Sequence, residues 1–138
     1  FLQIDSHNNT TLDGYPMSDI HTYGSNWSER HAAFICGLGT FGLSKGLITV
    51  RGVAGRYASI ILDVDLPADT RPYHDIYEYC VKCGRCADRC PAHAISIENG
   101  KDHIKCSEYC TETAKRFKPR YGCGLCQTDV PCESHNPN

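Results

Sequence analysis

The apolar and polar positions divide the chain into a polar opening, one helix, two strands and a cysteine-rich second half. The first 26 residues are mostly polar, which indicates loops with one short strand at Phe1–Ile4. Ser25–Cys36 then carries apolar side chains at helical spacing, so it predicts a helix that Asn26 or Ser28 caps. The glycine that follows Cys36 should end this helix.

Two apolar runs after the helix predict strands, at Leu47–Val50 and at Tyr57–Asp65. The second run is almost continuously apolar, which is the pattern of a strand buried on both faces. The turn between the runs carries Arg51 and Arg56. These two cations either face solvent or contact an anionic group of a cofactor or substrate.

The second half begins after a linker at Leu66–Pro72, which divides the chain into domains 1–66 and 67–138. Within it, Asn99-Gly100 separates two short apolar stretches and predicts a β-hairpin. Thr111–Arg120 predicts a short helix, whose four cations form either a solvated face or a docking surface. Helices and hairpins mixed in this way predict an α+β fold.

The strongest chemical signal is the stretch Cys80–Pro91, which reads C-x2-C-x2-C-x3-C-P. Bacterial ferredoxins use this run to hold cubane iron–sulfur clusters. Its first three thiolates can wrap around one cubane, while Cys90 points away and serves a second cluster. Zinc coordination and disulfides are the alternatives for so many cysteines.

Composition and charge indicate the cellular location and the partners of such an iron–sulfur protein. Nine of the ten cysteines gather in the second half of the chain at metal-ligand spacing. Thiolates must stay reduced to bind iron, which predicts a cytoplasmic protein. The net charge of −2 and the lack of a long apolar run argue against nucleic-acid and membrane binding. Each oxidised cubane with its four thiolates carries about −2, so two would bring the net charge to roughly −6. We therefore expect a redox partner protein with a basic docking surface.

Two cubanes with four thiolates each need eight of the ten cysteines. In the interleaved arrangement of two-cluster ferredoxins, the first cluster takes Cys80, Cys83, Cys86 and the late Cys132. The second cluster takes Cys90, Cys123, Cys126 and either Cys106 or Cys110. We favour Cys106, because the return arm of the hairpin at Asp102–Cys106 delivers it, and Cys110 is then free or a substitute ligand. Cys36 stands alone in the sequence and is expected to be a buried small hydrophobe.

Gly37, Gly39 and Gly42 form a G-x-G-x-x-G pattern. As a dinucleotide-binding fingerprint, this pattern would need a strand before it and a full helix after it. The preceding segment instead has a helical pattern, and Gly46 interrupts any helix that follows. The glycines therefore indicate a tight turn or a backbone that closely approaches another group.

Taken with these motifs, about residues 20–132 of the chain resemble the C-terminal half of the epoxyqueuosine reductase and reductive dehalogenase superfamily. Ser28–Gly42 is similar to that family's E-R…A-G-L-G-x-x-G segment, and the spacing from Cys90 to Cys106 also looks like the family's. The last cysteine motif departs from the family's C-x3-C-P, because here Pro131 precedes the final cysteine.

The resemblance implies a partial nitroreductase-like α/β segment, followed by a ferredoxin-like domain with two [4Fe–4S] clusters that relay single electrons to a cobalamin. The glycine-rich segment would then lie at the corrinoid, with the implied cofactor-binding residues Gly37, Gly39, Thr40, Gly42 and Arg56. Tyr23 stands six residues before the family's E-R pair, where epoxyqueuosine reductases have an aspartate. Because reductive dehalogenases use a tyrosine as proton donor, Tyr23 is the candidate proton donor; the alternative is a tyrosine that packs its ring at a domain edge. The implied partners are a redox protein and the corrinoid-binding remainder of the same protein.

Three classes of function are consistent with these observations. The leading hypothesis is the iron–sulfur part of a corrinoid-dependent reductase, which is an oxidoreductase. The alternative is a stand-alone ferredoxin-type electron carrier or subunit without a corrinoid, in which the residues before 66 form a docking domain. The third is a zinc-stabilised interaction domain.

Overall fold

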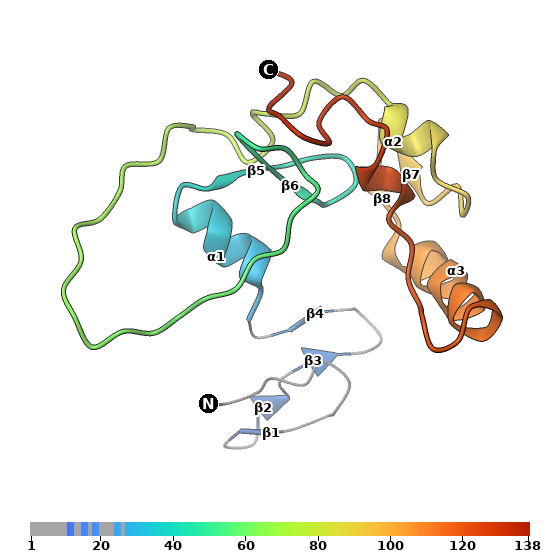
Figure 1. The fold of residues 1–138 in the computed structure, drawn as a ribbon, viewed down its shortest axis with the longest axis horizontal. Coiled ribbons are helices and arrows are strands. Elements are labelled where there is room, and N and C mark those ends of the chain that lie inside the picture. Colours follow the sequence, from blue (N-terminus) through green and yellow to red (C-terminus); the bar gives the residue numbers. More distant parts are fainter. Residues whose placement is uncertain (1–10, 13–14, 17, 20–23, 26) are drawn as a thin grey trace.

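The computed structural model of the protein describes residues 11–12, 15–16, 18–19, 24–25 and 27–138 (Figure 1). Phe1–Ile4 and Tyr23 lie outside the described residues, so the strand and the proton donor expected there stay predictions. Two short antiparallel pairs come first: β1 (Thr11–Leu12) with β2 (Tyr15–Pro16), and β3 (Ser18–Asp19) with β4 (Gly24–Ser25). No helix in the described part of the chain has the length and apolar character needed to cross a bilayer.

The predicted helix is α1, Glu29–Ile35. Ser28 is its N-cap, because its hydroxyl accepts a hydrogen bond from the N–H of His31. The helix ends at Cys36, and Gly37 follows with a φ of +83°, a left-handed conformation that glycine adopts without strain. Cys36 is exposed, so the prediction of a buried position is wrong. Cys36 is the C-cap of α1, one position beyond the helix, whereas the buried residue of the helix is Ala33.

An antiparallel hairpin follows α1 and consists of β5 (Gly39–Phe41) and β6 (Leu47–Thr49). Strand β6 confirms the strand predicted at Leu47–Val50. Strand β5 lies in the glycine-rich segment, and its pairing with β6 requires a glycine at position 39. A Cβ on Gly39 would lie 2.1 Å from the carbonyl oxygen of Ile48, so only glycine allows the two strands to approach this closely.

Two buried polar contacts join this hairpin to the chain that leads into the cysteine run. The hydroxyl of Thr40 accepts the N–H of Tyr79 at 2.8 Å. The hydroxyl of Tyr73 accepts the N–H of Gly39 at 3.3 Å and donates to the carbonyl of Phe34. The core around these contacts consists of Ile48, Val53, Tyr73, Tyr79 and Val130. The start of the cysteine run is therefore held against β5 and β6.

The strand predicted at Tyr57–Asp65 is wrong. This segment forms no strand and runs through the long loop that swings away from α1 in Figure 1. Its apolar side chains are exposed, and Ile61 is 97% exposed. Strand formation needs a neighbour for the backbone hydrogen bonds and a surface that buries the side chains, and the described residues give this segment neither. Two side chains at the start of the segment are anchored: the hydroxyl of Tyr57 donates to the carbonyl of Leu47 at 3.0 Å, and the hydroxyl of Ser59 donates to the carboxylate of Glu29 at 2.6 Å.

The second half contains α2 (Arg85–Asp88), β7 (Ile95–Ser96), β8 (Gly100–Lys101), α3 (His103–Arg116) and a 3-10 helix, η1 (Leu125–Gln127). Strands β7 and β8 pair antiparallel and confirm the predicted hairpin, in which Gly100 has a φ of +68°. Short helices and two-stranded sheets of this kind confirm an α+β fold.

Helix α3 begins earlier than the sequence pattern indicates. The carboxylate of Asp102 accepts the N–H groups of Ile104 and Lys105, and this cap starts the helix directly after β8. The helix predicted at 111–120 is therefore the end of a longer one. Cys106 and Cys110 lie one turn apart on α3, not on the return arm of a hairpin.

Candidate metal centre

The Cys80–Pro91 run begins as a sharply turning loop and then forms α2. Lys82 and Gly84 both have left-handed backbones, with φ of +50° and +77°. Such residues turn the chain sharply, which lets successive cysteines face inward. At the end of the loop Cys90 is buried, and its sulfur accepts the N–H of Ala94 at 3.3 Å. Cys80, Cys83 and Cys86 line a cavity that Cys90 does not line, although Cys80 and Cys86 also pack against the core around Cys90.

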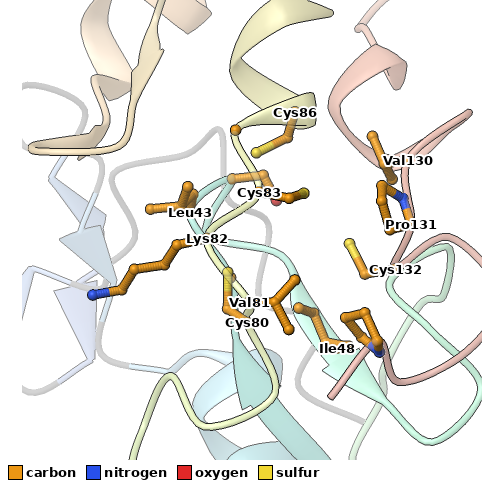
Figure 2. Close-up of a pocket in the computed structure, with 14 residues that line it drawn as sticks. Leu43, Ile48, Cys80, Val81, Lys82, Cys83, Cys86, Val130, Pro131 and Cys132 are labelled. Carbon is orange, nitrogen blue, oxygen red and sulfur yellow. The ribbon is translucent and has the colours of Figure 1, made fainter.

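The first cysteine group consists of Cys80, Cys83, Cys86 and Cys132, which line one cavity. Figure 2 shows these cysteines projecting toward a shared space between the run and the C-terminal segment. The wall around them is mostly apolar and includes Ile48, Val81, Val130 and Pro131. Four sulfurs around one space with apolar walls are the donor set that a [4Fe–4S] cubane needs.

Burial changes the acidity of these thiols. It raises the pKa of Cys86 to about 11, with smaller contributions from neighbouring Cys80 and Cys132. It also raises the pKa of Cys132. Several thiolates cannot stay charged together in an apolar cavity unless a cation compensates them. Bound metal provides that cation, and its binding releases the thiol protons. The first group therefore fits a metal cluster.

The second cysteine group is centred on Cys90. Cys90 is buried in a core with Leu43, Ala94 and Ile95, against which Cys106 and Cys126 pack. Burial raises the pKa of Cys126, which has Cys123, Cys106 and Cys90 as neighbouring thiols. The pKa of Cys110 is raised mainly by burial and further by the neighbouring thiol of Cys106. The four predicted ligands are thus neighbours, with Cys110 beside them.

The two cysteine groups are adjacent. Cys80 and Cys86 pack against the core around Ile48 and also against the core that contains Cys90. Within the described residues, no three His, Cys, Asp or Glu side chains converge closely enough to hold a single metal ion. That finding concerns a mononuclear site, whereas a cubane sets its thiolates around a larger object.

The residues expected at a cofactor lie in different places. Gly42 lines the first cavity, and a Cβ on it would lie 3.8 Å from the sulfur of Cys80. Gly39 and Thr40 lie within β5, where Thr40 is fully buried. Gly37 lies next to Arg71, away from both cysteine groups.

Arg56 lines an open hollow beside the second cysteine group, which Cys123 and Cys126 also line. Two further cations, Arg30 and Lys101, line the same hollow. The sequence alone does not single them out, since Arg30 reads as a residue of the first helical turn and Lys101 as part of the hairpin. One carboxylate, Glu29, also lines the hollow, so the three cations leave its lining with a net positive charge that can attract an anionic group.

Comparison with protein families agrees with this chemistry. Residues 73–96 match the family described as "4Fe-4S binding domain". This match and the cysteine arrangement define the protein as an iron–sulfur protein of the 4Fe-4S class. Relatives in sequence then place it within a superfamily.

An epoxyqueuosine reductase of Leadbetterella byssophila is 35% identical over 134 residues, which cover 89% of this chain and 39% of that protein. One of Cyclobacterium marinum is 34% identical over 116 residues, covering 75% of this chain and 36% of that protein. A tetrachloroethene reductive dehalogenase of Desulfitobacterium hafniense is 41% identical over 63 residues, covering 45% of this chain and 11% of that protein. No solved structure matches.

These relatives confirm the resemblance read from the motifs. The chain belongs to the superfamily of epoxyqueuosine reductases and reductive dehalogenases, and its residues 73–96 match a 4Fe-4S binding domain. It spans little more than a third of the length of the epoxyqueuosine reductases that it matches.

Proposed function

We propose that this chain is an electron-transfer module that holds two [4Fe–4S] clusters. The observation that carries the proposal is the pair of adjacent cysteine groups, which meet through Cys80 and Cys86. Each group combines cysteines of the Cys80–Pro91 run with cysteines from beyond residue 102, as interleaved two-cluster ferredoxins do. The first cluster has the ligands Cys80, Cys83, Cys86 and Cys132. The second has Cys90, Cys106, Cys123 and Cys126.

The chain's own residues adjust the chemistry of these clusters. When bound, the clusters supply one-electron redox chemistry, while the protein sets their potentials through ligation, hydrogen bonds and burial. The N–H of Ala94 donates to the sulfur of Cys90, and apolar side chains such as Val130 cover the first group. Lys101 lowers the pKa of Cys126 against the effect of burial, and a cation there also stabilises an added electron.

The names of the relatives support a larger role for the whole protein. In this proposal the module relays single electrons to a corrinoid held by the remainder of the same protein and receives them from a redox partner in the cytoplasm. The cations of the open hollow, Arg30, Arg56 and Lys101, are placed to attract an anionic group of such a cofactor. Gly42 brings the backbone close to the first cluster, and Tyr23 remains the proposed proton donor.

Iron and acid-labile sulfide analysis of protein purified without oxygen tests the two-cluster proposal. We expect about eight irons and about eight sulfides per chain, since each cubane holds about four of each. Reduction should then produce the EPR signals of two interacting [4Fe–4S] clusters. About four irons per chain, or zinc in place of iron, would overturn the proposal.

Reconstitution with cobalamin separates the corrinoid-linked role from that of a stand-alone carrier. We expect the cluster-loaded protein to retain a corrinoid absorbance band through gel filtration, and we expect weaker retention after Arg56→Ala. This substitution removes a cation from the hollow without touching a cysteine. Intact clusters with no retained corrinoid would instead support the carrier.

A further inference from the structure

Two arginines on α2 lie directly beside proposed cluster ligands. Arg85 precedes Cys86, and Arg89 precedes Cys90. Arg85 opens the four-residue helix and Arg89 is its C-cap, so the two side chains project from the same side, one turn apart. A side chain that binds both arginines therefore influences the positions of Cys86 and Cys90, one proposed ligand of each cluster.

Asp129 binds both arginines from a distant part of the chain. One of its carboxylate oxygens lies 3.0 Å from a terminal nitrogen of Arg85 and 2.8 Å from one of Arg89. Two further hydrogen bonds support the contact. The Nε of Arg85 donates to the backbone carbonyl of Asp129 at 3.4 Å, and the Nε of Arg89 donates to the carbonyl of Leu125 at 3.2 Å. These four interactions form a clamp between α2 and the C-terminal segment.

The backbone at Asp129 is itself held in place. Its φ is +52°, in the left-handed region that aspartate tolerates better than most residues. Its N–H donates to the carboxylate of Glu133 at 2.7 Å. Asp129 thus has a defined position, three residues after Cys126 and three residues before Cys132.

The clamp joins the two segments that both supply ligands to each proposed cluster. On one side are Cys86 and Cys90, and on the other are Cys126 and Cys132. Cys86 and Cys132 line the first cavity together, while Cys90 and Cys126 pack in the second group. Ion pairs as exposed as these add little to global stability, since the Asp129 side chain is 69% exposed. Their effect is expected to be local, on the distance between the two segments.

We propose that Asp129, acting through Arg85 and Arg89, is a positioning residue that keeps the C-terminal cysteines in register with the Cys80–Pro91 run. This inference rests on the proposed two-cluster function. In the absence of the clamp, the segment of residues 125–133 separates from α2 more often. Cys126 and Cys132 then move away from the Cys80–Pro91 run, so both clusters lose a ligand more often and release iron faster.

The test is the rate of iron loss to a chelator from cluster-loaded protein carrying Asp129→Ala. We expect about a tenfold faster loss, by analogy with other residues that support metal ligands. The matched control is Glu112→Gln, which removes the exposed pair between Lys115 and Glu112 at 2.7 Å on α3. The control should lose iron at the wild-type rate. The milder Asp129→Asn keeps the size of the side chain and should lie between the two.

Two further readouts separate positioning from a general loss of stability. If Asp129 and Arg89 act through one contact, the double variant Arg89→Ala/Asp129→Ala should lose iron no faster than Asp129→Ala alone. The EPR coupling between the two reduced clusters should also change in Asp129→Ala but not in Glu112→Gln. Iron loss from Asp129→Ala at the control rate overturns the inference. Wild-type protein without two clusters overturns the proposed function instead.

Discussion

Cys132→Ser is expected to remove the first cluster and leave the second, lowering the iron content from about eight to about four per chain. Of the four proposed ligands of the first cluster, only Cys132 comes from outside the Cys80–Pro91 run. Its sulfur closes the cavity from the side of Val130 and Pro131 (Figure 2). Serine is a poor ligand for iron in a cubane, and the remaining three thiolates leave one side of the cavity open.

Iron analysis and EPR of the reduced variant measure this result, because one cluster alone lacks the coupling between two. The matched control is Cys36→Ser, since Cys36 is exposed at the end of α1 and outside both groups. Cys110→Ser should also keep about eight irons per chain, whereas Cys106→Ser should lose the second cluster. A Cys132→Ser protein that still holds about eight irons contradicts the ligand assignment.

Removal of the iron is expected to unfold the second half of the chain while α1, β5 and β6 stay folded. The core around Cys90 consists largely of cysteines and small side chains, so without metal little apolar surface holds β7, β8 and α3 together. Of the residues of α3, only Thr113 is buried. By contrast, the cluster of Ala33, Phe41 and Leu47 contains no cysteine. Metal–thiolate bonds of structural sites contribute on the order of 10 kcal/mol to folding.

Hydrogen exchange before and after chelation measures this difference along the chain. Amides of α3, and of the β7–β8 hairpin, should lose their protection, while those of β5 and β6 keep most of theirs. A matched sample of Cys36→Ser protein controls for oxidation of a thiol outside the two groups. Unchanged protection of the α3 amides after complete loss of iron would contradict the prediction.

The cysteine grouping was accessible from the sequence because it depends on local spacing. The run from Cys80 to Cys90 allows few conformations in which its thiols meet, and the pair Cys123 and Cys126 is similarly restricted. Helix α1 and the β7–β8 hairpin were also predictable, since a Ser28 cap and an Asn-Gly turn act over a few residues. The ligand assignment and the domain boundary at residue 66 stay predictions.

Features that depend on distant residues were not predictable in the same way. The apolar run at Tyr57–Asp65 has the composition of a buried strand, but composition cannot tell whether a neighbouring strand is available. The sequence allows Asp102 either as part of a strand or as a helix cap, and in the structure it is the N-cap of α3. The clamp of Asp129 joins residues about forty positions apart, a distance at which no sequence periodicity operates.

The interleaving of the first group has a consequence for how the protein is made. Cys132 follows Cys80 by 52 residues, so the cavity that both line cannot close until the whole stretch has left the ribosome. At ordinary rates of translation this takes about 3 to 10 s. During that time Cys80, Cys83 and Cys86 are open to oxidants and to competing metals. Under the proposed ligand assignment, insertion of the first cluster follows synthesis of Cys132, and the nascent thiols need reducing conditions until then.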